Sequence, residues 1–302
     1  MLIGVGTLLV QLHQNGDLDI SRAVYQIANQ SWGILVVLLI GIVLTTMMTQ
    51  AFSFGFIRFL EGYWGPSALF NPFIRFMVRW HVWRKARRSK QVIDLEKKLF
   101  ESARARLLQE EEPKLVDVWE AQVYRVPKAN RRQKDEDIIT EALQIDWREK
   151  ADPSLVALFY RAVERMDGYP ALPTRVLPTA LGNVLRSAED SLGLSGHQLE
   201  RFVMENYERI PARLMSQHDQ FRDRLDMYSM LTLVFFGLAV TAFPLLWDSN
   251  GTIPWVPAVV GLMLFAVLSW LSYVAAIASA RAYGAVLRAM NVQVKQHTSQ
   301  PR

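Results

Sequence analysis

The sequence has no cysteine among its 302 residues. Disulfides, thiolate nucleophiles, zinc–thiolate sites and iron–sulfur clusters are therefore excluded. Nucleotide-binding and hydrolase motifs such as Walker A, Gly-x-Gly-x-x-Gly and Gly-x-Ser-x-Gly are also missing. Histidines are few and far apart, and they share no acidic neighbour at metal-ligand spacing: His13, His81, His197, His218 and His297. The sequence predicts no cofactor, no metal site and no catalytic residue, so we expect the protein not to be an enzyme.

Charge is absent from three long apolar stretches, in a chain that is 51% hydrophobic. A helix needs roughly 20 apolar residues to cross a bilayer. Backbone amides in lipid must be bonded locally, so helix is the state expected there. We therefore predict transmembrane helices at residues 32–57, 227–247 and 255–278. Proton-coupled carriers place ionisable groups inside the membrane, and these stretches contain none.

Only seven residues, 248–254, separate the second predicted span from the third. Such a short connection forces the two helices into an antiparallel hairpin. Asn250-Gly251 and Pro254 supply residues that favour tight turns.

Basic residues are distributed unevenly around the predicted spans. Residues 58–90 contain eight Lys or Arg and a single acid, Glu61, whereas Arg22 is the only basic residue before the first span. Four basic residues and no acid follow the third span. The positive-inside rule then predicts that segment 1–31 is external and that the central domain and the 279–302 tail are cytoplasmic.

Residues 58–90 interleave aromatic rings with arginine, which is typical of segments in the lipid headgroup layer. We expect this interfacial segment to be broken at Gly65-Pro66 and at Pro72. Its basic end is predicted to contact lipid headgroups through Arg84, Lys85, Arg87, Arg88 and Lys90. Nucleic acid is the disfavoured alternative partner.

Residues 91–226 form the largest polar segment, in which 25 acids outnumber 21 bases. Helical spacing of apolar residues predicts a helix over 91–112 that ends at Pro113, while 113–126 is ambiguous between helix and strand. Asp152 is expected to cap a helix that runs to Met166, and Thr179 one that runs to about Leu192. We therefore predict a helical cytoplasmic domain.

A longer amphipathic pattern covers residues 195–226, interrupted mildly at Pro211, and leads into the second span. A continuous helix there would link the domain mechanically to the membrane hairpin. In the third span and just after it, small residues recur every fourth position at Ser272, Ala276, Ala280 and Gly284. Such a face allows close helix packing, either with the second span or with another subunit.

Three short stretches together resemble a loose group of uncharacterised actinobacterial membrane proteins. They are Leu60-Glu61-Gly62-Tyr63-Trp64, then Leu177-Pro178-Thr179-Ala180-Leu181-Gly182-Asn183-Val184-Leu185-Arg186 with Glu189, and Ala280-Arg281-Ala282-Tyr283-Gly284. In that group a Pro-Thr-x-Leu-Gly-Asn element likewise precedes a membrane hairpin. The resemblance implies a bacterial inner membrane and brings no activity, cofactor or catalytic residue.

These observations predict an all-α integral membrane protein with a helical cytoplasmic domain between the first and second of three spans. The leading functional hypothesis is a non-enzymatic scaffold or regulatory subunit that contacts lipid and binds a protein partner. We expect the partner to contact an exposed turn made of Pro178, Thr179, Gly182 and Asn183. The alternative is an oligomeric pore or membrane-disrupting effector gated by the cytoplasmic domain. Neither hypothesis includes a small-molecule substrate.

Overall fold

The computed structural model describes residues 25, 36, 39–40, 43–44, 47, 55–65, 71–111, 113–125, 136–193, 199–247 and 255–299. Most of the first predicted span, 32–57, lies outside these residues. So do most of segment 1–31 and the connection 248–254.

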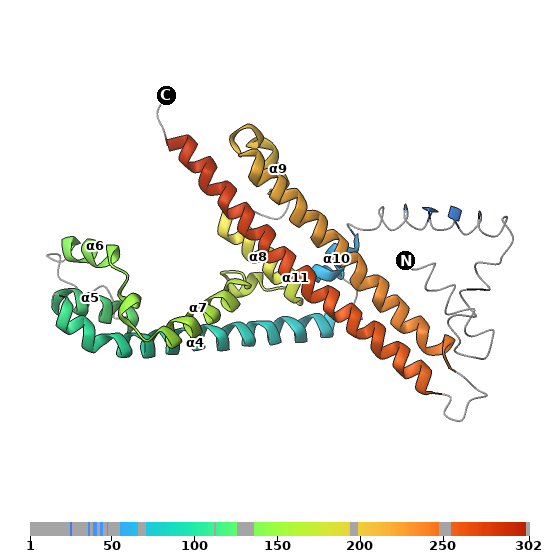
Figure 1. Ribbon diagram of the computed structural model, residues 1–302, viewed down its shortest axis with the longest axis horizontal. Coiled ribbons are helices and arrows are strands. Elements are labelled where there is room, and N and C mark those ends of the chain that lie inside the picture. The colour runs from blue at the N-terminus through green and yellow to red at the C-terminus, as the bar shows by residue number, and fades with distance from the viewer. Residues whose placement is uncertain are drawn as a thin grey trace. The chain divides into compact units, whose positions relative to one another are not determined.

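Within the described ranges the chain is helical and contains no strand. This confirms the predicted all-α class. The helices are α4 (Asn71–Glu110), α5 (Pro113–Val123), α6 (Glu136–Gln144), α7 (Pro153–Asp167), α8 (Ala180–Leu192), α9 (Leu199–Glu205), α10 (Ala212–Leu245) and α11 (Val256–Ser299), joined by 3₁₀ turns η3 (Trp147–Lys150), η4 (Pro173–Arg175) and η6 (Tyr207–Arg209) (Figure 1).

The chain divides into two compact units. Unit 1 combines Met1–Pro72 with Leu177–Arg302, and unit 2 is Phe73–Val176. The predicted domain 91–226 is therefore shared between them, because α8, α9 and the start of α10 belong to the unit that holds the apolar hairpin.

Unit 2 has a core of large side chains. The most deeply buried are Leu99, Phe100, Leu107, Val116 and Trp119, which come from α4 and α5. The edge of the Trp147 ring packs against Phe100, with ring centroids 5.3 Å apart. Burying one such side chain contributes about 1.5–3 kcal/mol, so the core explains why this segment folds as a unit.

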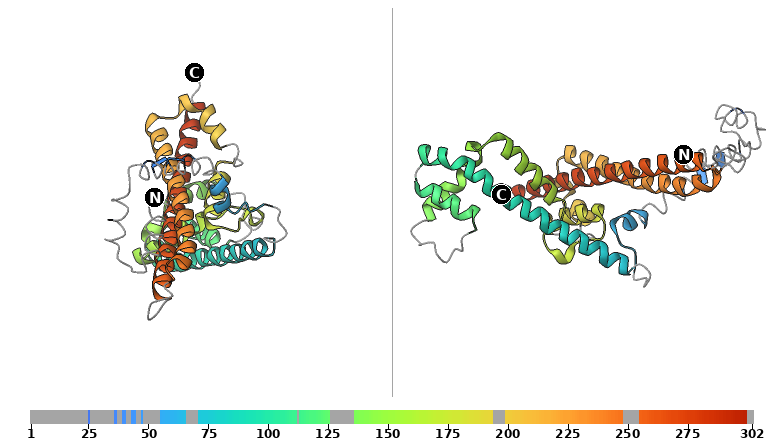
Figure 2. Two further views of the ribbon diagram at one scale, coloured as in Figure 1. Left: turned by 90° about the vertical axis from the view of Figure 1, so that its right-hand side faces the viewer. Right: turned by 90° about the horizontal axis from the view of Figure 1, so that it is seen from below.

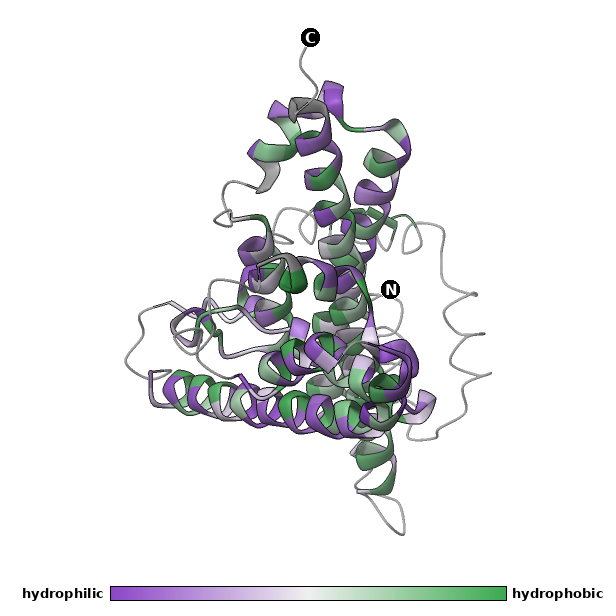
Figure 3. Ribbon diagram, turned by 90° about the vertical axis from the view of Figure 1, so that its left-hand side faces the viewer, coloured by the Kyte–Doolittle hydropathy of each residue, from purple (hydrophilic) through white to green (hydrophobic). Residues whose placement is uncertain are grey.

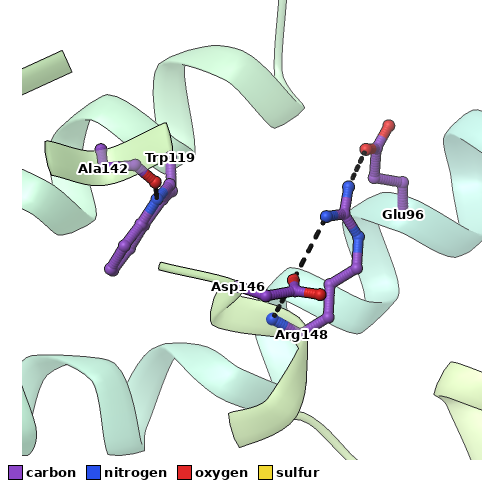
Figure 4. Close-up of polar contacts among 5 residues, drawn as sticks. All are labelled: Glu96, Trp119, Ala142, Asp146 and Arg148. Carbon is purple, nitrogen blue, oxygen red and sulfur yellow. Dashed lines mark hydrogen bonds and ion pairs between the residues drawn. The ribbon is translucent and has the colours of Figure 1, made fainter. Parts of the chain in front are cut away.

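Trp119 and Arg148 make polar contacts inside unit 2 (Figure 4). The indole Nε1 of Trp119 donates to the carbonyl of Ala142 over 2.9 Å. The Arg148 guanidinium donates to Glu96 Oε1 at 3.4 Å and to Asp146 Oδ1 at 3.3 Å, and it lies over the Trp147 ring. These contacts fix η3 against α4.

Local signals placed several helices of unit 2 correctly. The Asp152 carboxylate accepts from the Ser154 amide over 2.7 Å and caps α7, as predicted. The ambiguous stretch after Pro113 is helix α5.

Pro72 lies in the first turn of α4 and so marks the start of this helix. α4 begins at Asn71 and runs without interruption to Glu110, because proline in the first turn of a helix has no amide partner to lose.

Unit 1 is built around a hairpin of α10 and α11, which pack side by side (Figures 1 and 2). This confirms the predicted antiparallel pairing. At Gly261 a Cβ atom would lie 2.5 Å from Leu246 and 3.5 Å from Ala242, so small residues permit a close approach. Ala242 and Ala258 are fully buried.

The hairpin end next to the 248–254 connection is hydrophobic (Figure 3). By length and composition, α10 and α11 could each cross a membrane. Only 33% of the apolar window in α10 and 17% of that in α11 is buried, unlike the core helix of a water-soluble protein. Side chains more than half exposed there include Phe236, Val240, Val260, Met263 and Trp270.

The amphipathic pattern over 195–226 is not one helix. α9 and η6 are separated from α10 at Pro211, which caps the N-terminus of α10. From Ala212 the helix continues unbroken into the apolar stretch, as predicted. The tail after residue 278 is also ordered helix, because α11 extends to Ser299 and buries Leu287 and Met290 against residues of α9 and α10.

Candidate functional site

The first element of the site is a helix end that follows the first predicted span. Residues 55–61 are helical, and Gly62 ends the helix with φ +98°. The Gly62 amide donates to the carbonyl of Phe59, and the Tyr63 amide donates to that of Arg58, at 3.0 and 2.9 Å. This is a Schellman motif, which requires the left-handed backbone that glycine adopts without strain.

The second element is the turn that leads into α8. Thr179 Oγ1 accepts from the Gly182 amide over 3.1 Å and caps the helix. The buried Asn183 amide group accepts from Leu177 N at 2.8 Å and donates to the carbonyls of Leu177 and Thr179 at 2.9 and 2.8 Å. Asn183 therefore fixes the turn by satisfying its backbone groups.

These two elements pack backbone to backbone. A Cβ atom at Gly182 would lie 2.1 Å from the carbonyl oxygen of Glu61, and one at Gly62 would lie 2.5 Å from Pro178. Neither position has room for a side chain. The two glycines belong to two of the sequence motifs, and their spatial contact explains why both motifs need glycine.

The third element is α11. The Leu181 amide donates to the Tyr273 hydroxyl over 3.3 Å, so α11 helps to cap α8. Farther along α11, a Cβ at Gly284 would lie 2.9 Å from the Cβ of Ala188. All three sequence motifs thus meet in one place, which we call the three-motif junction.

Charged groups line one edge of the junction. Arg186 Nη2 donates to the Tyr63 hydroxyl over 2.7 Å, and Arg186 Nη1 pairs with Glu189 at 3.3 Å. Arg58 lies 4.9 Å from the centre of the Tyr63 ring. Burial, and then the negative charge of Glu189, raise the pKa of Glu61 to about 7, against the opposing effect of Arg58 and Arg186.

Two titratable groups of the junction have raised pKa values. The Glu61 carboxyl changes charge near neutral pH while its own backbone carbonyl contacts α8. Burial also raises the pKa of Tyr63, whose hydroxyl oxygen accepts from Arg186.

A second feature of unit 1 is a groove of about 400 Å³ beside η6 and the start of α10. Its lining combines apolar side chains with carboxylates: Tyr207, Ile210, Met215, Asp219 and Asp223. Nearby, buried His218 contacts Asp219 at 3.0 Å and the Tyr283 hydroxyl of α11 at 3.2 Å. Among the residues that the structure describes, no three His, Asp or Glu side chains gather in a way that could hold a metal ion.

Comparison of the chain with protein-family models, curated proteins and solved structures finds no match. The actinobacterial resemblance therefore stays a prediction.

The predicted helix-packing face lies in contacts within this chain. Ala276 and Ala280 are fully buried in a cluster with Leu181 and Val184 of α8 and Leu225 of α10. Gly284 contacts Ala188 of α8, and Ser272 is buried. A third helix, α8, thus covers a face for which the sequence suggested only the second span or another subunit.

The expected partner-binding turn is not exposed. Pro178, Gly182 and Asn183 are buried, and Thr179 is half-buried as the α8 cap. This corrects the expectation of a surface turn, because the Gly62 helix end occupies it.

The predicted headgroup contacts fall into two groups. Lys85 Nζ donates to the carbonyls of Pro170 and Ala171 at 2.7 and 2.6 Å, and Arg88 donates to that of Arg165 at 2.8 Å. These two side chains therefore hold the end of α7 and the turn after it. In contrast, Arg84, Arg87 and Lys90 are exposed.

Sequence reasoning missed the charged edge made by Glu61, Tyr63, Arg186 and Glu189. Residues 61 and 189 are far apart in sequence, and no local spacing relates them. All four residues stand in or beside two of the sequence motifs, but the motifs do not show that these side chains meet.

Proposed function

We propose that this chain is a non-enzymatic, membrane-anchored scaffold or regulatory subunit whose helical part binds a protein partner at the cytoplasmic face. The single observation that carries the proposal is the continuity of α10 and α11. Each helix passes without a break from an exposed apolar surface into a packed bundle with α8.

The exposed apolar surface supports membrane anchoring. α11 exposes large apolar side chains from Val256 to Val274, a distance of about 28 Å at 1.5 Å per residue. That length matches the hydrocarbon thickness of a bilayer. The surplus of basic residues near the other ends of the apolar stretches supports an orientation with the central segment and C-terminus in the cytoplasm.

The groove beside η6 supports partner binding. Tyr207, which is 64% exposed, and Met215 line the groove, and Met204, three residues before Tyr207 in the chain, is 76% exposed. Methionine and tyrosine are adaptable contact residues at protein interfaces. The carboxylates of Asp219 and Asp223 favour a partner segment that combines apolar and basic side chains.

Anchoring and orientation are tested with single cysteines in this cysteine-free chain. The single variants Lys98→Cys and Ser249→Cys are labelled in intact cells with a membrane-impermeant maleimide. We expect labelling at 249 only, with 98 labelled after permeabilisation. Labelling of both positions in intact cells, or release of the protein by alkaline carbonate, would contradict the proposal.

Partner binding is tested by purification in mild detergent followed by mass spectrometry. Met204→Glu/Tyr207→Glu is compared with the matched surface variant Leu143→Glu/Leu158→Glu in unit 2, where both leucines are also exposed. We expect a stoichiometric partner that is lost only with the first variant. Recovery of the same amount of partner with both variants would exclude the groove as the binding site. If the wild-type protein recovers no stoichiometric partner, the scaffold role is rejected.

The pore hypothesis has weaker support. It needs a face for self-association, but Ala276, Ala280 and Gly284 are already occupied by α8 and α10 of the same chain. A pore would have to use the exposed side chains of α10 and α11 instead. Native mass spectrometry together with liposome leakage distinguishes the two hypotheses, because a non-leaking monomer is incompatible with a pore.

A further inference from the structure

The first half of α4 has two different faces. One face packs within unit 2: His81 Nδ1 contacts the Tyr169 hydroxyl at 3.2 Å, and Lys85 and Arg88 bind carbonyls at and just after the end of α7. Polar groups on this face are therefore committed to holding unit 2 together.

The opposite face exposes four aromatic rings. Phe73, Phe76, Trp80 and Trp83 are 51%, 64%, 38% and 56% exposed. Their spacing of three or four residues places them on one side of the helix. A water-soluble surface rarely gathers four exposed large rings along three turns, so this stripe needs an apolar environment.

Basic side chains surround the rings. The guanidinium of Arg84 lies 4.9 Å from the centre of the Trp80 ring, and that of Arg87 lies 5.6 Å from that of Trp83. Lys90 is exposed at the end of the stripe. No acid occurs in α4 before Asp94, so the face is uniformly positive.

We propose that this face of α4, which we call the aromatic–basic stripe, lies on the surface of an anionic lipid bilayer. The stripe consists of Phe73, Phe76, Trp80, Trp83, Arg84, Arg87 and Lys90. This inference rests on the proposed membrane anchoring and adds a second, peripheral contact made by unit 2.

Charge and composition favour lipid over other occupants. Tryptophan and arginine occupy the headgroup layer together, because the ring is amphipathic and the guanidinium binds phosphate. Nucleic acid would use the basic residues but would leave Phe73 and Phe76 exposed to water. The stripe also begins only sixteen residues after Ile57, the end of the first predicted span, so about 55 Å of chain at most separates it from the bilayer.

The basic residues of residues 84–90 have two different roles in the structure. Lys85 and Arg88 were expected to contact headgroups, but their nitrogens are bound inside unit 2. Arg84, Arg87 and Lys90 remain available for phosphate, and the four rings supply the buried apolar area.

The test uses the full chain in nanodiscs, with spin labels at single cysteines. The chosen sites are Phe76→Cys in the stripe and Glu164→Cys at an exposed position of α7. Power saturation compares label accessibility to oxygen, which concentrates in lipid, with accessibility to a water-soluble nickel chelate. In discs containing phosphatidylglycerol we expect label 76 to favour oxygen and label 164 to favour nickel.

A charge variant sharpens the test. Arg84→Gln/Arg87→Gln/Lys90→Gln should shift label 76 toward nickel, as should discs of pure phosphatidylcholine. The matched variant Lys98→Gln/Lys114→Gln/Arg161→Gln removes the same charge from exposed positions elsewhere in unit 2 and should leave label 76 unchanged.

The outcomes separate this inference from the proposed function. If label 76 favours nickel while the protein stays in the discs, the stripe does not lie on lipid but the anchoring stands. If label 76 is shielded from both reagents, or if added RNA displaces it from lipid, the stripe binds a macromolecule instead. If the protein leaves the discs, the anchoring itself fails.

Discussion

The two units of this protein differ in how their helices meet and in what they expose. Unit 2 buries Phe100 and Trp119 and covers them with charged helices. Unit 1 also buries large side chains such as Leu287, but its helices meet most closely at small residues such as Gly284, and its hairpin exposes Trp270. Water explains the first pattern, because hiding large apolar side chains from it drives folding.

The second pattern fits a different solvent. Lipid tails are as apolar as leucine, so burying a large side chain gains little there, and helices associate through close packing of small residues. The comparison therefore teaches that the stability of unit 2 depends on large side chains that fill its core. The stability of unit 1 depends on small residues that let its helices approach closely. The predictions below test that difference.

Removing volume from unit 2 should have the largest effect. Trp119→Ala leaves a cavity in the core and removes the hydrogen bond to Ala142, at a cost of about 3–5 kcal/mol in the free energy of unfolding. Amide hydrogen exchange across α4–α7 measures the loss. Leu143→Ala, at a 70% exposed position, is the control and should change little; equal effects would mean that the core is not the source of stability.

A pH change should act on unit 1. The folded-state pKa of Glu61 lies above its ordinary value of 4.5, so protonation favours the folded junction. Its contribution is complete below about pH 4.5 and is lost as the pH rises through about 7. We expect unfolding of unit 1 to become easier by up to about 3 kcal/mol across that window, measured by hydrogen exchange in α8 after correction for intrinsic rates.

Glu61→Gln provides the matched variant for the pH effect. Glutamine is neutral at all pH values, so the stability measured by hydrogen exchange in α8 should no longer depend on pH. At pH 8 the variant should be more stable than the wild type. An unchanged pH profile in this variant would show that another group titrates. Wild-type unit 2, monitored in the same samples, reports any general effect of pH.

Adding volume to unit 1 should be the next most damaging change. Gly182→Ala places a methyl group 2.1 Å from the Glu61 carbonyl, and the backbone must separate at a cost of about 1–3 kcal/mol. Gly237→Ala in α10 adds the same methyl group where no atom lies within 4 Å. That control should be neutral or more stable, because alanine favours helix by about 1 kcal/mol over glycine. Denaturation in detergent measures the stability of the two variants. If both lose stability, close packing at Gly182 does not explain the effect.

Surface charge in unit 2 should matter least. Lys150 pairs with Glu110, and this pair lowers the pKa of Glu110, yet both side chains are exposed to solvent. Water and salt screen such pairs. Glu110→Gln should therefore leave the melting temperature of unit 2 unchanged within error at low and at high ionic strength. A clear drop at low salt would mean that unit 2 relies on charge as well as core volume.

Local chemistry predicted much of the helical framework. Asp152 and Thr179 were recognisable as caps because a short side-chain oxygen before a helix can satisfy a free amide. The 212–245 helix and its continuation into the apolar stretch followed from uninterrupted helical spacing. Pro72 lies at the start of α4, where its missing amide costs the helix no hydrogen bond.

The site was predictable only as separate pieces. The motifs around Gly62, Gly182 and Gly284 could be seen in the sequence, but their meeting could not, because no periodicity reports contacts between residues more than a hundred positions apart. Burial raises the pKa of Glu61, and that burial comes from packing against α8. The roles of Lys85 and Arg88 likewise depend on where α7 ends.

By itself, the sequence determined that the chain is helical, that α10 and α11 pair, and that long stretches suit lipid, since these properties follow from local spacing and composition. Tertiary structure alone decided that three glycine-containing motifs form one junction, that the pKa of the half-buried Glu61 carboxyl is raised, and which basic residues stay exposed. Those properties depend on distances between remote side chains, which folding sets and local sequence does not encode.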